Sequence, residues 1–307
     1  MTLIKMRSFL LVCCCMYSVF SSAQEKETKK TDDKHTSYFK ASANYLSNSL
    51  YNGRKDSLAT PYISPGIGYY DKSGFYITGG ISYLASSSES RIDLVSFDAG
   101  YDFSFSDNFT GGVYANKSFY NQSSTAVKSD IKGSIGGTLS YDLGFLQLST
   151  GIDVLFADKA DIALNFGLAH AFYVGDKDDL WTITPSVTTN LSTLNFYEGY
   201  TNRRVGKNAK SKIPNLASIT TTTTVNNSKL TLMDYEISLP INYDGKKWGL
   251  FFTPTLALPQ NPISTTTVSN IKLKNGTEST ETHDTTPPSE KNLQNTFYVE
   301  VGVYIKF

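Results

Sequence analysis

The chain ends on Phe297-Tyr298-Val299-Glu300-Val301-Gly302-Val303-Tyr304-Ile305-Lys306-Phe307, and this stretch decides the fold. Its odd positions are all apolar, whereas its even positions are Tyr, Glu, Gly, Tyr and Lys. Strict alternation with a period of two predicts a β-strand that has one apolar face and one polar face. An all-β fold is therefore the first expectation.

Eleven further segments alternate in a similar way, so the sequence predicts about twelve strands. In chain order their spans are 36–50, 60–70, 74–87, 91–105, 109–120, 128–141, 145–157, 161–174, 180–197, 230–243, 248–259 and 296–307. Short polar turns follow the even-numbered strands, such as Asp71-Lys72-Ser73-Gly74, and the connections after odd-numbered strands are generally longer. An even strand number with short turns at one end and long loops at the other is typical of a transmembrane antiparallel up-and-down β-barrel.

Two of the long connections, 198–229 and 260–295, are rich in threonine and serine. The first contains five consecutive threonines, Thr220 to Thr224. Because threonine favours extended backbone, we expect strands here that continue beyond the membrane as a ribbon or rim. Segment 275–289 is expected instead to be solvated chain without regular structure.

The N-terminus has the layout of a secretory signal peptide. Lys5 and Arg7 precede an apolar run over 9–20, and small residues follow it at a suitable cleavage site. Three consecutive cysteines in this run raise lipidation as an alternative, but Val12 before them is not the small residue that a lipoprotein signal needs. The expected organisation is a cleaved signal peptide over 1–23, a charged periplasmic leader over 24–35 and a barrel over 36–307.

The alternating closing strand resembles that of bacterial outer-membrane β-barrel proteins. In that class an aromatic C-terminus, here with Val303, Ile305 and Phe307 on the apolar face, is the signal read by the barrel-assembly machinery. The Tyr/Asn/Ser-rich strands, and Gln24 after the cleavage site, look like those of Bacteroidetes barrels. The resemblance implies a protein of the Gram-negative outer membrane that contacts outer-membrane lipid and has both termini in the periplasm.

Alternation also assigns charged residues to the barrel interior, because a charge that faces lipid at the midplane costs about 2–4 kcal/mol. The candidate pore-lining residues are Lys40, Asp98, Asp102, Lys132, Asp153, Asp234, Glu236 and Glu300. Six acids against two bases predict a lumen that favours cations. The alternative is a network of ion pairs and hydrogen bonds that fills a narrow barrel. Twelve strands lie between the sizes typical of filled and open barrels.

Enzymatic, cofactor, metal and nucleic-acid functions are not expected. His170 is placed on the outward face of its strand with no serine among its outward neighbours, so a membrane-facing Ser–His pair is not supported. Isolated histidines offer no metal-ligand spacing, and a formal net charge of zero does not favour nucleic acid. Two functions remain: a passive, porin-like channel for small solutes or ions, and a closed barrel whose Thr-rich loops bind a partner protein, glycan or surface.

Overall fold

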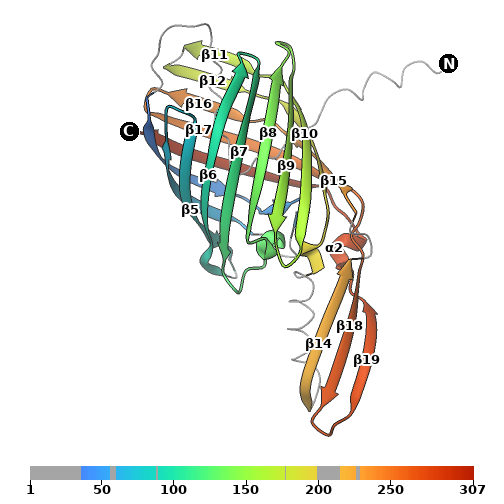
Figure 1. Ribbon diagram of the computed structural model, residues 1–307. Helices are drawn as coiled ribbons and strands as arrows, with labels where there is room; N and C mark the ends of the chain where they lie inside the picture. Colours follow the sequence, from blue (N-terminus) through green and yellow to red (C-terminus); the bar gives the residue numbers. More distant parts are fainter. Residues whose placement is uncertain (1–35, 56–59, 88, 177, 199–214, 226–228) are drawn as a thin grey trace, which may run out of the picture.

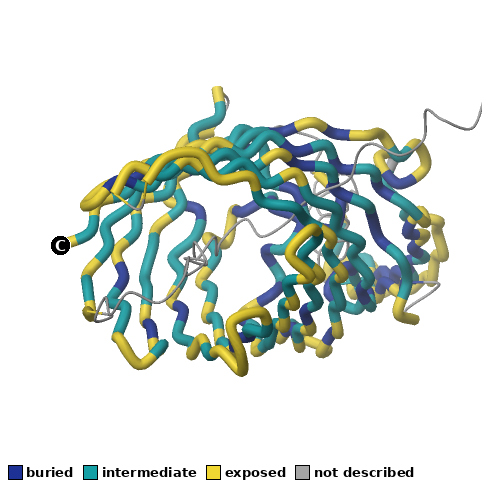
Figure 2. Tube along the Cα trace, turned by 90° about the horizontal axis from the view of Figure 1, so that it is seen from above, coloured by how far each residue is buried: buried dark blue, intermediate teal, exposed yellow. Residues whose placement is uncertain are grey.

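The computed structural model describes residues 36–55, 60–87, 89–176, 178–198, 215–225 and 229–307. The strands form one closed antiparallel barrel, whose strands wrap round a common axis (Figures 1 and 2). Its wall consists of β1 (Tyr38–Leu46), β4 (Tyr62–Tyr70), β5 (Phe75–Ala85), β6 (Ser90–Ser106), β7 (Phe109–Tyr120), β8 (Gly133–Asp142), β9 (Gln147–Phe156), β10 (Ala160–Ala169) with β11 (Phe172–Asp176), β12 (Asp179–Ile183) with β13 (Ser186–Ser192), β15 (Thr231–Ser238) with β16 (Ile241–Gly245), β17 (Trp248–Pro259) and β20 (Thr296–Lys306). β20 pairs with both β1 and β17, which closes the sheet. The predicted twelve-stranded barrel is confirmed.

Three of the predicted strands are each broken into two pieces. The breaks fall between β10 and β11, between β12 and β13 at Thr184-Pro185, and between β15 and β16 at Leu239-Pro240. Proline has no N–H to donate to the ladder, so the regular pairing lapses there. Backbone bonds from His170 to Pro185 (3.0 Å) and from Thr184 to Pro240 (2.9 Å) hold the pieces together across the breaks. The wall therefore stays continuous.

The outward face of the barrel is a belt of exposed apolar side chains. Ile67, Phe97 and Ile135 are each more than half exposed. Members of the belt are Phe39, Ile67, Ile77, Phe97, Val113, Ile135, Ile152, Phe166, Phe252 and Val303. A soluble protein rarely exposes so large a contiguous apolar surface, whereas a transmembrane barrel turns such a band toward lipid. None of the described helices is long and apolar enough to cross a membrane.

Aromatic rings gather at the end of the barrel that carries the short turns. Phe105 stacks on Phe109 at 4.9 Å, and Tyr243 lies 5.1 Å from Trp181 and 4.9 Å from Trp248, between ring centroids. Aromatic girdles are typical of the interfacial level of a membrane barrel. The girdle marks this end as one edge of the apolar belt.

Phe307 closes the seam between the first and last strands. Its ring lies 6.2 Å from that of Phe39, and the two backbones exchange hydrogen bonds of 2.9 and 3.0 Å. Phe307→Ala should lower the yield of folded barrel, because the seam between β1 and β20 loses this ring contact. The measurement is the fraction of protein that resists SDS unfolding before boiling. Phe297→Ala, at the other end of β20, is the control, and equal yields for both variants would contradict the expectation.

A second, three-stranded sheet projects beyond the long-loop end of the barrel (Figure 1). It consists of β14 (Leu216–Val225), β18 (Thr265–Leu273) and β19 (Glu278–Asp284). The threonine run lies in β14, so the expected ribbon is confirmed. The expectation that 275–289 lacks regular structure is wrong, because β19 and α2 (Pro288–Lys291) lie there. A turn with Gly276 at φ +88° brings β19 into register with β18, where pairing satisfies its backbone.

Candidate functional site: the barrel interior

One part of the inner wall, the small-residue wall, contains a row of very small residues. Ser42, Gly66, Gly80, Ser96 and Ser118 form a continuous row across β1, β4, β5, β6 and β7 in the strand register. A Cβ added at Gly80 would meet its nearest neighbouring atom, the Pro65 carbonyl oxygen, only at 3.4 Å. Small side chains therefore leave space inside this wall, which the sequence signalled only through the glycine pair Gly79-Gly80.

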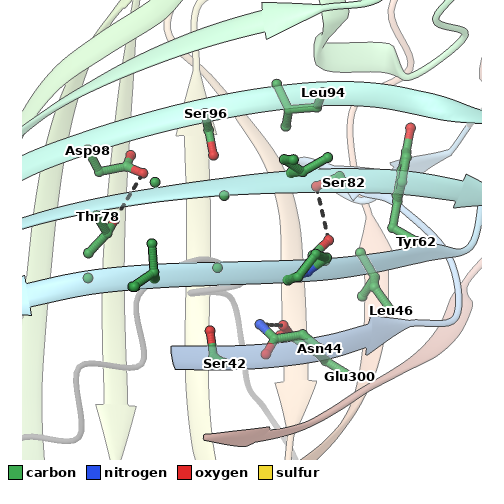
Figure 3. Close-up of a pocket in the computed structure, with 18 of the residues that line it drawn as sticks. Ser42, Asn44, Leu46, Tyr62, Thr78, Ser82, Leu94, Ser96, Asp98 and Glu300 are labelled. Atoms are coloured by element: carbon green, nitrogen blue, oxygen red, sulfur yellow. Dashed lines mark hydrogen bonds between the residues drawn. The ribbon is translucent and has the colours of Figure 1, made fainter. Parts of the chain in front are cut away.

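A cavity of about 250 Å³ lies against this small-residue wall. Figure 3 shows side chains of β1, β4, β5, β6 and β20 pointing into it. Ser64 donates to Ser82 at 3.0 Å, Thr78 donates to Asp98 at 3.4 Å, and Asn44 donates to Glu300 at 3.4 Å. The lining therefore combines hydroxyl, amide and carboxyl groups with apolar side chains such as Leu46, Leu94 and Phe251.

Charges of both signs face the cavity. Three acids, Asp98, Asp244 and Glu300, and two bases, Lys40 and Lys128, are among its lining residues. Among the described residues, no ion pair joins these acids to these bases. The ammonium of Lys40 instead lies 4.5 Å from the ring centroid of Tyr304. Three acids against two bases leave a smaller acidic excess than the sequence predicted.

Lys128 enters the cavity from the short helix η1 (Val127–Asp130), which lies in the long connection between β7 and β8. Burial lowers the pKa of its ammonium group, and the nearby Glu300 carboxylate opposes that change. Lys128 is not among the predicted pore-lining residues, because the sequence predicted that a strand begins at position 128. The cavity thus contains a half-buried lysine that no wall strand carries.

The side of the interior that faces the cavity is filled by side chains and loops at the long-loop end of the barrel. An apolar cluster joins inner-wall residues Leu155 and Met233 to loop residues Leu194, Phe196 and Ile263. Part of the filling is a hairpin of β2 (Leu50–Tyr51) and β3 (Arg54–Lys55). We call segments 50–55, 194–198 and 288–291 the mouth plug. Figure 2 shows buried positions concentrated on one side of the barrel.

A tight turn at Asn52-Gly53 shapes the hairpin of the mouth plug. Asn52 has φ 49° and Gly53 has φ 72°, the signs that a type I′ hairpin turn requires. A Cβ at Gly53 would meet Cβ of Asp234 at 2.9 Å, so the turn packs directly on the inner wall. The Asn-Gly dipeptide is a strong hairpin signal that the sequence analysis overlooked.

A buried ion pair fastens the mouth plug. The Arg54 guanidinium donates to the carbonyls of Asn52 (2.7 Å), Met233 (2.5 Å), Gln260 (2.6 Å) and Asn261 (2.9 Å). Its Nε lies 3.5 Å from Glu290, and the two side chains are 3% and 1% exposed. Burial lowers the pKa of Arg54, whereas the Glu290 carboxylate raises it. This one guanidinium therefore joins the β2–β3 hairpin to strand β15 and to the connection 260–295.

Both carboxylate oxygens of Glu290 accept hydrogen bonds. It accepts hydrogen bonds from the Tyr197 hydroxyl (3.3 Å) and from the backbone N–H of Ile263 (2.9 Å). Asp161 has a similar role on β10, where it accepts bonds from Thr193, Asn195 and Phe196 at 2.6–2.7 Å. These carboxylates hold loops inside the barrel mouth, which is the network that the alternative interpretation of the interior charges described.

The predicted pore-lining residues divide between the cavity and the filled side of the interior. Lys40, Asp98 and Glu300 line the cavity. Asp153 accepts a bond of 2.8 Å from Tyr114, Asp234 accepts one of 2.8 Å from Asn190, and Glu236 is completely buried. Asp102 lies on the inner face of β6, where its carboxylate would contact a Cβ placed at Gly112. The structure therefore does not bring the eight residues together in one ring.

Lys132 differs from its expected place. It lies just before β8, and its exposed ammonium forms an ion pair of 2.5 Å with the exposed Asp158. The physical reason is that β8 begins at Gly133 rather than at 128, so Lys132 belongs to the rim. The pair neutralises a charge at the loop end and adds none to the cavity.

Two bulges explain further differences in facing. The register between β5 and β6 shifts after Ser82, which turns both Asp93 and Leu94 away from the outer face. The register between β13 and β15 shifts beside Met233, which is 0% exposed although alternation placed it outward with Tyr235. A bulge inserts one residue and reverses the facing on one side of it.

His170 lies in the break between β10 and β11. Its ring centroid is 4.5 Å from that of Phe172 in an edge-to-face contact, beside the aromatic girdle. Among the described residues, no group of three or more His, Cys, Asp or Glu side chains is arranged to hold a metal ion. His170 thus packs with aromatic rings at the interfacial level.

Comparison with known sequences gives no relative: no protein family matches the chain, and no curated protein does. Solved structures with a similar chain path are outer-membrane proteins. A KdgM porin has 10% identity and a TM-score of 0.41, with 87% of this chain and 99% of that chain covered. A NanC porin has 11% identity and a TM-score of 0.43, with 88% and 100% covered. A bacterial polysaccharide outer membrane secretin has 8% identity and a TM-score of 0.38, with 90% and 100% covered.

All three TM-scores lie below 0.5, so these likenesses transfer neither solutes nor functional residues to this chain. The class of the protein follows from its own geometry instead. It is a closed twelve-stranded β-barrel with an apolar belt outside, a cavity with charged and hydroxyl groups in its lining, and a mouth filled by loops.

Proposed function

We propose that this protein is a passive outer-membrane channel for small polar solutes or ions, with a modest preference for cations. The single observation that carries the proposal is the cavity along the small-residue wall, which is lined by charged and hydroxyl groups among apolar side chains, inside a closed barrel with an apolar belt. An aqueous path would run past Lys40, Asp98 and Glu300 and beside the mouth plug. The short-turn end would then face the periplasm together with both termini.

The cation preference of the proposed channel is assigned to Asp98 and Glu300. Carboxylates in a narrow, low-dielectric lumen raise the local concentration of cations. The double variant Asp98→Asn with Glu300→Gln should shift the zero-current potential in a salt gradient toward, or past, the value of an unselective pore, because Lys40 and Lys128 then dominate the cavity. Asp107→Asn, which removes a charge at a short turn, is the control. An unchanged potential in the double variant would rule these carboxylates out as the filter.

A second candidate function is surface binding by the projecting sheet. The observation that favours it is that β14, β18 and β19 extend beyond the barrel and that β19 is exposed along its whole length (Figure 1). A sheet in that position adds nothing to a channel wall. Deleting it should leave conductance in place and abolish any attachment of cells to the target surface. Loss of conductance on deletion would instead make the sheet part of the channel.

A further inference from the structure

One face of the projecting sheet is a grid of threonine side chains. The strand register places three rows side by side: Thr220, Asn270 and Thr280; Thr222, Val268 and Thr282; and Thr224, Thr266 and Asp284. Six of these nine residues are threonine, and seven of the nine are exposed. Adjacent strands lie roughly 4.8 Å apart, and alternate residues repeat roughly every 6.6 Å along a strand. The grid therefore presents hydroxyl groups at two regular spacings.

Several hydroxyls of this grid are available for a ligand. Those of Thr220, Thr222 and Thr282 make no hydrogen bond within the part of the chain that the structure describes. On the opposite face, by contrast, Thr223 shares a hydrogen bond with Thr267, and both side chains are buried. The threonines on one face of the sheet are therefore buried and bonded to each other, whereas those on the other face point to solvent.

The grid carries no free charge. Lys272 at one end pairs with Glu278 at 2.6 Å, and Asp284 at the other end pairs with Lys291 at 2.8 Å. The remaining ionisable side chains of β19, Glu281 and His283, lie on the opposite face, and His283 Nε2 is 3.1 Å from Glu281 Oε2. An anionic polymer would need unpaired Lys or Arg, and a protein partner favours Tyr, Trp, Phe, Met or Arg. The grid offers neither.

We propose that the threonine grid binds an extended neutral polysaccharide, an inference that rests on the surface-binding candidate function. Each threonine hydroxyl both donates and accepts, as does each sugar hydroxyl, so one regular array can bond to the other in many registers. The threonine methyl groups and Val268 pack against the C–H faces of the sugar rings. Affinity comes from repetition of weak contacts along the polymer.

The test is co-sedimentation of the full-length protein in detergent micelles with insoluble cellulose or mannan, and with alginate gel as the anionic comparison. The triple variant Thr220→Val, Thr222→Val and Thr282→Val removes three hydroxyls and retains β-branched side chains of the same size. It should weaken neutral-polysaccharide binding roughly tenfold or more, from the loss of three hydrogen bonds. The matched control is Glu281→Gln with His283→Gln on the opposite face, which should bind as the wild type does. Resistance to SDS verifies that every variant is folded.

Three results would overturn the inference. Equal neutral-polysaccharide binding by the triple variant would place the site elsewhere. Binding of alginate alone would retain surface binding but contradict the neutral class of ligand. Absence of binding to all three polysaccharides would refute the grid as a polysaccharide site. The channel proposal would still stand, because it is tested separately by conductance.

Discussion

Glu290→Gln is expected to release the mouth plug and to raise the conductance of the barrel severalfold. The substitution leaves Arg54 charged and buried without its carboxylate, and breaking a buried pair in this way costs about 3–5 kcal/mol. The Tyr197 hydroxyl and the Ile263 N–H donate to different oxygens of Glu290, and a glutamine offers only one acceptor oxygen, so the variant also loses one of these two bonds. Single-channel recording gives the conductance, and protease sensitivity of segment 50–55 reports the displaced hairpin.

A control and a second variant accompany this prediction. Glu278→Gln breaks an exposed pair with Lys272, which contributes little because solvent screens it, and should leave conductance unchanged. Arg54→Met combined with Glu290→Leu removes both charges but also the bonds from Arg54 to four backbone carbonyls, so it should raise conductance at least as much as Glu290→Gln does. If Glu290→Gln conducts as the wild type does, the mouth plug does not restrict the path.

Gly80→Leu is expected to reduce conductance severalfold. A Cβ at Gly80 would have no neighbouring heavy atom closer than 3.4 Å, so the new side chain fits the wall and extends into the cavity. Pore diameter is a direct determinant of conduction. The measurement is again single-channel current, with the yield of SDS-resistant protein as the check on folding.

The neighbouring residue supplies a matched control. Gly79 shares the outer face with Phe97, and a Cβ there would lie 3.3 Å from that exposed ring. Gly79→Leu therefore adds the same side chain to the lipid face and should conduct as the wild type does. Equal reductions in the two variants would mean that the loss reflects a distorted wall rather than a narrowed path.

The barrel itself could be predicted from the sequence because alternation is a local property of each strand. The closing strand 297–307 faces as its pattern indicates, with Phe297 and Val303 exposed and Tyr298 buried. Strand number and turn asymmetry followed from the same local signals. The breaks at Pro185 and Pro240 were not predicted, because proline alone does not locate a break: Pro65 and Pro254 lie within the unbroken strands β4 and β17.

The interior could be predicted only in part, because it depends on contacts between distant segments. Arg54 and Glu290 meet through two loops that no periodicity describes, and each alone looks like a solvated surface charge. The bulge beside Met233 depends on how β13 pairs with β15, which alternation within one strand cannot reveal. The predicted acidic excess of the lumen included every acid on an inward face. Asp234 and Glu236 face inward but lie in the filled side of the lumen, away from the cavity.

The central claim is that a continuous aqueous path crosses this barrel. The most direct measurement is the single-channel current of the refolded, signal-free protein in a planar bilayer under a salt gradient. Steady openings with a modest cation preference are the predicted result. A silent membrane, from protein that resists SDS unfolding until it is boiled, would contradict the claim and would mean that the mouth plug and its network close the barrel.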